Sequence, residues 1–274
     1  MKIFIANRND SGRTILKFLQ KVISDVPNSR MEKLFRKKDI KINGKRISNK
    51  NYNIKFGDEI IVYGIISQGL KDYKKAKPSF KVIFEDENIL VVDKPTGISI
   101  HDEDNCLDNQ VLTYLNWKTT SSFTPSHIGR IDKVTSGIVL YGKTYESLRQ
   151  LKYNQSKFKK IYTYQSDMEK EIETNYIIGH DENKKRMCIH PKGDLTKTKF
   201  YKEGSMKLAR IYTGKKHQIR VSLAKLGFPI NGDVKYGGKK DSRVYLHSYI
   251  TIIQNLSRDL SYLNGMRFIS KPEW

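Results

Sequence analysis

One loop and the strand after it carry the residues best suited to chemistry. Arg130 and Asp132 directly precede Thr135-Ser136-Gly137 and an apolar, β-branched run at 138–141. The run predicts a buried strand, and Gly137 permits a tight entry into it. A carboxylate on a loop that feeds a rigid core strand can act as a nucleophile or a base. Arg-x-Asp alone is more often a surface ion pair, but the buried strand behind it favours a functional site.

A second block, residues 212–227, predicts a helix beside a cleft. Its apolar residues recur at helical spacing: Ile219, Leu223 and Leu226. The helix should begin near Lys215 or Lys216 and end before Gly227, so that its positive end and two lysines attract an anion. His217 and Arg220 are three residues apart and share a face other than the apolar one, which lets Arg220 point into the cleft.

The overall charge indicates a polyanionic partner. Lys and Arg number 51 against 29 Asp and Glu, which gives a formal net charge of +22. Such an excess favours nucleic acid, although a merely solubilising lysine-rich composition is the alternative. Sixteen Tyr and eleven Phe favour RNA, because aromatic rings stack on bases. The sequence contains neither an apolar run of 18 residues nor a strongly amphipathic basic helix, so it does not favour a membrane as the partner.

The cysteines and the N-terminus predict a cytoplasmic location. Cys106 and Cys188 lie far apart and have no zinc-ligand spacing, which predicts neither a disulfide framework nor a metal site. The first eight residues lack the apolar core of a signal peptide.

Residues 11–65 predict a compact helix and hairpin module. Ser11 is expected to cap a first helix, and a second helix is expected to start at 28–30. Residues 39–46 alternate apolar and basic side chains around Asn43-Gly44, a strong hairpin signal, and 57–62 reads as a turn and a closing strand.

This module resembles the alpha-L RNA-binding domain, first seen in a ribosomal small-subunit protein. The resemblance rests on Ser29-Arg30, on 40–45 and on Gly57-Asp58-Glu59-Ile60. A basic helix beside a basic hairpin can follow an RNA backbone through phosphate contacts, whereas a solvated basic face is the alternative. The resemblance implies that six residues contact RNA: Ser29, Arg30, Lys33, Lys41, Asn43 and Lys45.

Residues 66–80 lose apolar periodicity and gain Lys, Gly and Pro, which predicts a linker. A second domain then opens with two apolar strands, 82–84 and 89–92, and a turn at 93–97 containing Lys94 and Pro95. We interpret these two residues as mainly architectural. The expected domains are 1–65, the linker 66–80 and a domain over 81–274.

The second domain resembles the RluA-type pseudouridine synthases. Their signature Arg-Leu-Asp-x-x-Thr-Ser-Gly is met by 130–137, with Ile131 in place of leucine. Gly129 stands where the family usually has histidine, which leaves the role of His127 open. The family's Thr-Gly-Arg-x-His-Gln-Ile-Arg is met by 213–220, with lysine at position 215. Its Lys-x-Tyr is met by 160–162, so that Tyr162 is the site tyrosine and Tyr164, on the same strand face, is the alternative.

The resemblance implies an α+β fold, in which a mainly antiparallel sheet with flanking helices and a central cleft follows the small RNA-binding domain. It also implies a cofactor-free enzyme that isomerises uridine to pseudouridine in structured RNA, with large-subunit ribosomal RNA the expected substrate, as in the RluC and RluD branches. Asp132 is then the nucleophile, Arg220 its partner and Tyr162 the residue that packs on uracil. Attack on the base, attack on ribose C1′ and removal of a ribose proton all fit. We expect a monomer.

The flipped nucleotide and its phosphates need further contacts, because a base leaves its stack at a cost of a few kcal/mol. Arg130 is the expected wedge or phosphate clamp, and Lys215, Lys216 and His217 the expected RNA contacts beside it.

Three alternatives stay open. Asp132 and Arg220 could form only a buried salt bridge between subdomains, or the chain could be a non-catalytic RNA-binding or ribosome-assembly factor. A synthase for transfer RNA is the third. A metal-dependent nuclease or a glycosidase would need clustered carboxylates, which do not accompany Asp132.

Overall fold

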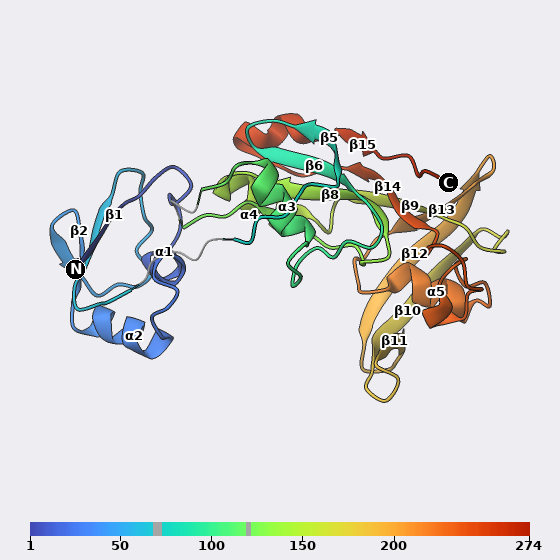
Figure 1. Ribbon diagram of the computed structural model, residues 1–274, viewed down its shortest axis with the longest axis horizontal. Coiled ribbons are helices and arrows are strands. Elements are labelled where there is room, and N and C mark those ends of the chain that lie inside the picture. The colour runs from blue at the N-terminus through green and yellow to red at the C-terminus, as the bar shows by residue number, and fades with distance from the viewer. Residues whose placement is uncertain (68–72, 119–121) are drawn as a thin grey trace. The chain divides into compact units, whose positions relative to one another are not determined.

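The computed structural model describes residues 1–67, 73–118 and 122–274, which form two compact units (Figure 1). The first unit comprises Met1–Lys74, Tyr114–Pro125 and Thr144–Glu146. The second comprises Lys75–Thr113, Ser126–Lys143 and Ser147–Trp274. The linker expected over 66–80 lies partly outside the described residues, and the domain boundaries drawn from the sequence stay a prediction.

The first unit packs two short helices against a four-stranded sheet of order β1-β4-β2-β3. Its elements are β1 (Lys2–Ile5), α1 (Ile15–Val22), α2 (Asn28–Arg36), β2 (Ile40–Ile42), β3 (Lys45–Ile47) and β4 (Glu59–Val62). Thr14, and not Ser11, caps α1, because the backbone of residues 12 and 13 pairs with Ile54 and leaves Thr14 as the first side chain able to reach the helix. The expectation for Ser11 was therefore wrong.

The predicted hairpin turn is present between β2 and β3. Asn43 and Gly44 both have positive φ, 49° and 78°, as a two-residue turn of the type favoured in hairpins requires. The Asn43 side chain also donates to Asp58 Oδ1 and accepts from the Glu59 backbone N–H, both at 2.9 Å. Asn43 therefore ties the hairpin to the start of β4.

The second unit is built on an 11-stranded, mainly antiparallel sheet (Figure 1). The strand order is β11-β10-β12-β13-β9-β14-β8-β6-β5, with β15 on β14 and β7 on β8. Its strands are β5 (Lys81–Glu85), β6 (Ile89–Lys94), β7 (Ser126–Ile128), β8 (Ser136–Gly142), β9 (Lys159–Tyr164), β10 (Ile172–Asp181), β11 (Arg186–Ile189), β12 (Asp194–Glu203), β13 (Met206–Ile211), β14 (Leu246–Ile252) and β15 (Arg267–Ile269). Its helices are α3 (Leu107–Tyr114), α4 (Tyr145–Asn154), α5 (Gln218–Lys225) and the short 3₁₀ turns η1 (Val234–Tyr236) and η2 (Arg258–Leu263).

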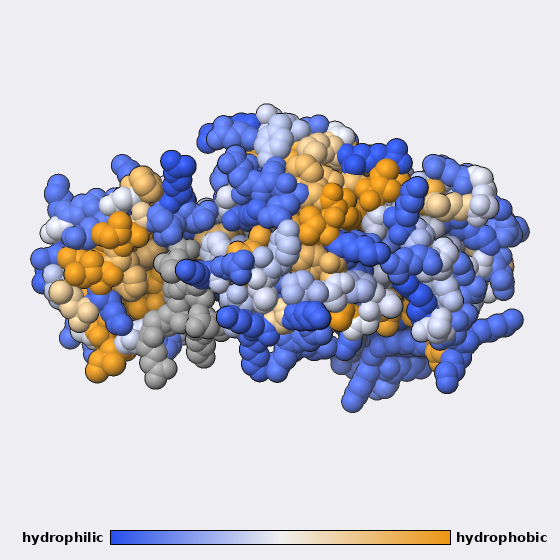
Figure 2. Space-filling model, turned by 45° about the horizontal axis from the view of Figure 1, so that its top comes forward, coloured by the Kyte–Doolittle hydropathy of each residue, from blue (hydrophilic) through white to orange (hydrophobic). Residues whose placement is uncertain are grey.

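Helices flank the sheet, as the sequence predicted. Leu151 of α4 packs with Ile138 and Leu140 of β8 in one apolar cluster. In another cluster, Ile219 and Leu223 of α5 pack with tyrosine and phenylalanine side chains of β9 and β12. Hydrophilic residues cover most of the face shown in Figure 2, in keeping with the 51 Lys and Arg.

Strand β8 is the centre of the second unit. All its residues are buried, and it pairs antiparallel with β6 and parallel with β14. Gly137 meets β14 so closely that a Cβ atom there would lie 2.3 Å from the Ser248 carbonyl oxygen. A glycine at this point is therefore required by the approach of two strands as well as by its φ of 108°.

Replacing Gly137 with alanine should lower the free energy of unfolding by about 3 kcal/mol, because the two strands must separate. The matched control is Gly204→Ala in the β12–β13 turn, where φ is 59° but nothing lies within 4 Å of an added Cβ. Gly204→Ala should lower the free energy of unfolding by only about 1 kcal/mol, because alanine is strained in the left-handed conformation. Urea unfolding measures both, and equal losses would contradict a role for the close approach.

Candidate active site

Asp132 lies on the loop between β7 and β8. The Thr135 N–H donates to the Asp132 carbonyl oxygen at 3.0 Å, which closes a tight turn, and Gly129 enters it with a φ of 69°. The turn presents the Asp132 side chain outward, and 22% of that side chain is exposed. A carboxylate presented in this way is accessible to substrate but held by a short, fixed segment.

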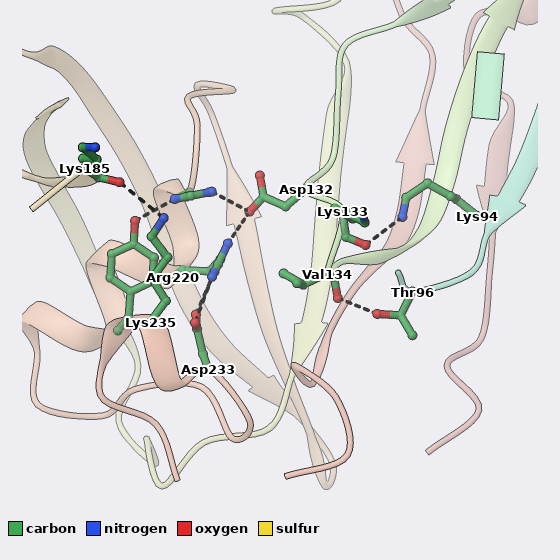
Figure 3. Close-up of polar contacts among 11 residues, drawn as sticks. Lys94, Thr96, Asp132, Lys133, Val134, Lys185, Arg220, Asp233 and Lys235 are labelled. Atoms are coloured by element: carbon green, nitrogen blue, oxygen red, sulfur yellow. Dashed lines mark hydrogen bonds and ion pairs between the residues drawn. The ribbon is translucent and has the colours of Figure 1, made fainter. Parts of the chain in front are cut away.

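The turn after β6 holds this loop from behind (Figure 3). The Gly97 N–H donates to the Lys133 carbonyl at 2.8 Å, and the Thr96 hydroxyl donates to the Val134 carbonyl at 2.9 Å. The fully buried Lys94 ammonium group donates to the carbonyls of Pro95 and Ile98 at 2.9 and 2.8 Å, and to that of Lys133 at 3.4 Å. Burial lowers the pKa of Lys94 to about 7, against the opposing charge of Asp132. Lys94 therefore serves the loop and does not reach solvent.

Arg220 of α5 joins Asp132 to a second carboxylate, that of Asp233 (Figure 3). Its Nη1 lies 3.0 Å from Asp132 Oδ2, while Nε and Nη2 lie 2.7 and 2.8 Å from the two oxygens of Asp233. The Arg220 and Asp233 side chains are only 5% and 1% exposed. Burial alone would lower the pKa of Arg220, but the hydrogen bonds and charges of Asp233 and Asp132 outweigh it and raise that pKa. Arg220 therefore remains a cation and fixes the direction of the Asp132 carboxylate.

His217 is the residue before α5, and it also faces Asp132. Its Nε2 lies 3.7 Å from Asp132 Oδ2, and its Nδ1 lies 2.6 Å from the Tyr236 hydroxyl. Burial lowers the pKa of His217 to about 4, and the charge of Asp132 opposes this shift. Burial likewise raises the pKa of Tyr236 to about 12, so the hydroxyl stays protonated and can donate to Nδ1. In that tautomer the imidazole carries its proton on Nε2, towards Asp132.

The helix begins later than the sequence predicted. It starts at Gln218, and His217 before it has a left-handed backbone with φ 56°. The Gln218 side-chain oxygen accepts from the Lys215 N–H at 3.1 Å and from the Thr213 hydroxyl at 2.9 Å, which holds residues 213–217 as a loop. The expectation of a helix start at Lys215 or Lys216 was therefore wrong. Both lysines lie on this loop.

Tyr162 of β9 faces a small cavity beside Asp132. The cavity measures about 50 Å³, and its apolar lining includes Ile131, Ile219 and Leu246. Burial raises the pKa of Tyr162 to about 12, a hydrogen bond with Ser248 acts against this, and the hydroxyl is neutral. Tyr164 does not line this cavity but a different one. Of the two tyrosines, the structure brings only Tyr162 to Asp132.

A larger basic groove of about 710 Å³ adjoins the cavity and shares Asp132 with it. Its cationic lining residues are Arg130, Lys133, Lys152, Lys215, Lys216, Arg220 and Lys235. The exposed Arg130 lines both the groove and the cavity, and its guanidinium lies 3.0 Å from His101 Nε2. Lys215 also pairs with Asp194 at 3.0 Å. The groove therefore offers mostly positive charge around a single exposed carboxylate.

The residues expected to bind RNA in the N-terminal module form a separate group in the first unit. Ser29, Arg30, Lys33 and Lys45 are exposed, and Lys41 is half-buried. Arg30 donates to the Gly64 carbonyl at 2.9 Å. Asn43 differs from the others, since both of its amide atoms are used within the module.

Two residues of the site received no role from the sequence. Asp233 directly precedes the 3₁₀ turn η1 and Tyr236 ends it, and their signal in the sequence is a glycine beside each, Gly232 and Gly237. Gly232 permits this segment, because a Cβ there would lie 1.7 Å from the Arg243 carbonyl oxygen.

Two general features of the described residues complete the site description. Among residues 1–67, 73–118 and 122–274, no group of three or more His, Cys, Asp or Glu side chains could hold a metal ion. In the same ranges, no helix is long and apolar enough to span a membrane.

Comparison with known proteins identifies the family. The RNA pseudouridylate synthase profile matches residues 88–225. A Mycoplasma capricolum subsp. capricolum protein named uncharacterized RNA pseudouridine synthase is 32% identical over 100% of this chain and 99% of its own length. Ribosomal large subunit pseudouridine synthase C of Buchnera aphidicola subsp. Baizongia pistaciae is 30% identical over 95% of this chain and 87% of its own.

The fold agrees with the sequence relatives. The solved structure of human RNA pseudouridylate synthase domain containing 1 has a TM-score of 0.58 at 18% identity and covers 71% of this chain and 84% of that one. The second unit therefore has the fold of that structure, and the sequence relatives give the class of enzyme, an isomerase acting on RNA. The chain belongs to the RNA pseudouridylate synthase family, and the predicted fold class and enzyme class are confirmed.

Asp233→Asn should disconnect Arg220 from its anchor, because an amide cannot accept both guanidinium hydrogen bonds. We expect the free energy of unfolding to fall by about 3 kcal/mol, as when one partner of a buried ion pair is removed. The isomerisation rate should fall with it. Urea unfolding and rate measurements test this, with the exposed Asp167→Asn as the matched control; a stability equal to that of the control would refute the anchoring role.

His217 should make stability depend on pH. Its pKa in the folded chain, about 4, lies below the ordinary value of 6.5, so the unfolded chain takes up a proton first as the pH falls. The stabilisation is present above about pH 6.5 and is lost as the pH falls through about 4. His217→Gln should therefore lose less stability than the parent between pH 7 and 4, whereas His180→Gln, at a half-exposed site, should follow the parent. The free energy of unfolding is measured against pH for the parent and both variants. If the three curves run parallel, His217 does not cause the pH dependence.

Proposed function

We propose that this chain converts uridine to pseudouridine in large-subunit ribosomal RNA, with Asp132 as the nucleophile. The observation that carries the proposal is the Asp132 carboxylate held by Arg220 at 3.0 Å, beside the cavity lined by Tyr162. Two relatives are named ribosomal large subunit pseudouridine synthase C and D, which supports the choice of RNA.

The reaction needs a nucleophile and a closed pocket, and it consumes nothing. The N-glycosidic bond of uridine breaks, the uracil turns, and a bond from ribose C1′ to uracil C5 forms while the C5 proton leaves for solvent and N1 gains one. Substrate and product have the same composition. Asp132 can begin this by attack on the base or on C1′, or by taking a ribose proton, and in each case Arg220 holds and aims its carboxylate.

Tyr162 and the cavity walls hold the freed base. The neutral ring packs on the uracil, and we assign to its hydroxyl the transfer of the C5 proton. The apolar side chains of Ile219 and Leu246 exclude water from the same space. His217 places a second N–H beside Asp132, 3.7 Å from Oδ2.

The cationic residues bind the RNA around this centre. Arg130 in the groove fills the space left by the flipped base or clamps a phosphate, and Lys215 and Lys216 follow the backbone. We further propose that the first unit acts as an alpha-L-type RNA-binding domain through Ser29, Arg30, Lys33, Lys41 and Lys45. Asn43 supports them by fixing the hairpin. The chain acts as a monomer in the cytoplasm.

Asp132→Asn should abolish the activity and leave RNA binding intact. Purified parent, Asp132→Asn and the control Asp167→Asn are incubated with unmodified ribosomal RNA, and pseudouridine is scored chemically. The rate with Asp132→Asn should fall at least about 10³-fold, because the nucleophile is lost while Asp233 still balances Arg220.

Equal product from the parent and Asp132→Asn would remove Asp132 from the mechanism. Product from the parent on transfer RNA but not on ribosomal RNA would overturn the proposed substrate and retain the reaction.

A further inference from the structure

A second basic surface lies on the sheet face turned away from Asp132. In the β13–β9 register, Ala209 pairs with Tyr162 and Arg210 pairs with Ile161. Side chains alternate between the two faces of a strand, so Arg210 lies on the face opposite to the Tyr162 side chain. Lys199 of β12 pairs with Arg210 and shares its face.

Two like charges are paired directly across β12 and β13, which destabilises a sheet unless something compensates. Lys199 and Arg210 are such a pair, and in the described ranges neither has a carboxylate within ion-pair distance. The contrast is Lys202 opposite Lys207 on the same strands, where Glu169 binds both lysines, at 2.6 and 2.5 Å. Glu169 thus binds both lysines of the second pair, whereas the carboxylate opposite Lys199, that of Glu173, binds Lys197 at 2.8 Å.

Each of these cations has an aromatic ring beside it. Lys199 lies 5.8 Å from the Tyr201 ring centroid, and Arg210 lies 4.6 Å from that of Tyr212. Both rings are half-buried, and Tyr201 packs on the apolar cluster that includes Leu208. The rings are therefore held in place by the sheet and present part of their surface to solvent.

We propose that this β12–β13 face, made of Lys199, Arg210, Tyr201 and Tyr212, binds a single-stranded segment of the RNA substrate. Unpaired cations supply phosphate contacts, and tyrosine rings on a sheet supply stacking surfaces for unpaired bases. The segment differs from the one in the Asp132 groove, because the two surfaces lie on opposite faces of the sheet. The proposal rests on the proposed function in that RNA is the ligand.

The test uses a fluorescein-labelled oligoadenylate, which contains no uridine to react at Asp132. Its dissociation constant is measured by fluorescence anisotropy at several salt concentrations. Lys199→Gln/Arg210→Gln should weaken binding about tenfold and reduce the slope of log K against log salt by about 1.4, since each single-strand phosphate contact contributes about 0.7.

The matched control removes two charges elsewhere. Lys192→Gln/Lys225→Gln changes two exposed lysines that line neither the cavity nor the groove, and it should alter binding less than twofold. Parent-like binding by Lys199→Gln/Arg210→Gln, or an equal loss in the control, would overturn the proposal. So would release of the oligoadenylate from Lys152→Gln/Lys216→Gln at the same salt, because these two lysines line the groove and the bound site would then be the groove.

Tyr201 separates stacking from charge. Tyr201→Phe keeps the ring and should bind oligoadenylate within twofold of the parent, whereas Tyr201→Leu should bind several-fold more weakly. Melting temperatures within a few degrees of the parent's exclude unfolding as the cause. If Tyr201→Leu binds like Tyr201→Phe, the face is not a stacking platform and the proposal is refuted.

The outcome is independent of the ribosomal RNA assay. Absence of pseudouridine in the parent reaction together with face-dependent oligoadenylate binding would remove the proposed substrate and keep the surface. If the parent forms pseudouridine but oligoadenylate binding does not depend on the β12–β13 face, the proposed substrate is kept and the proposed surface is lost.

Discussion

The buried guanidinium of Arg220 is the interaction on which the site depends. A cation that is 5% exposed is costly unless carboxylates and hydrogen bonds compensate it, and Asp233, itself almost fully buried, supplies two of those bonds. Asp233 alone would neutralise the cation. Asp132 is then a second carboxylate bound to the same guanidinium, and of the two carboxylates it is the one that faces solvent. The fold thus keeps one anion for structure and leaves one available for chemistry.

The rigid background of Asp132 comes from segments far apart in the chain. The Lys94 ammonium group and the Gly97 N–H both donate to the Lys133 carbonyl, directly beside Asp132. The close contact of Gly137 with Ser248 fixes the strand that the loop feeds. The carboxylate is therefore held from two sides, by backbone behind it and by Arg220 in front, and little reorganisation is needed when substrate arrives.

Much of this could be predicted from the sequence where local patterns decide the structure. The 138–141 run predicted β8, the alternation around Asn43-Gly44 predicted its hairpin, and the motif at 213–220 predicted Arg220 near Asp132. The roles of Asp233 and Tyr236 could not be predicted, because they lie on a segment without periodicity and act through contacts made only in the folded chain. The start of α5 was misplaced because the Gln218 side chain binds the preceding loop, a contact that helix-spacing rules do not include. The bounds of strands β10 and β12 could not be predicted, since many of their residues on both faces are exposed and leave no alternating pattern.

The order in which the site's parts occur along the chain has a consequence for synthesis. Asp132 and the strand it precedes are made early, whereas Arg220, Asp233 and β14 follow roughly 90 to 120 residues later in the printed sequence. Contacts of such separation form only after the intervening chain is available. A nascent chain that has reached residue 210 already contains Asp132 but lacks the Arg220 guanidinium that holds it. The contacts that fix Asp132 therefore form only once residues 220–252 have left the ribosome, and a chain that stops before them cannot make them.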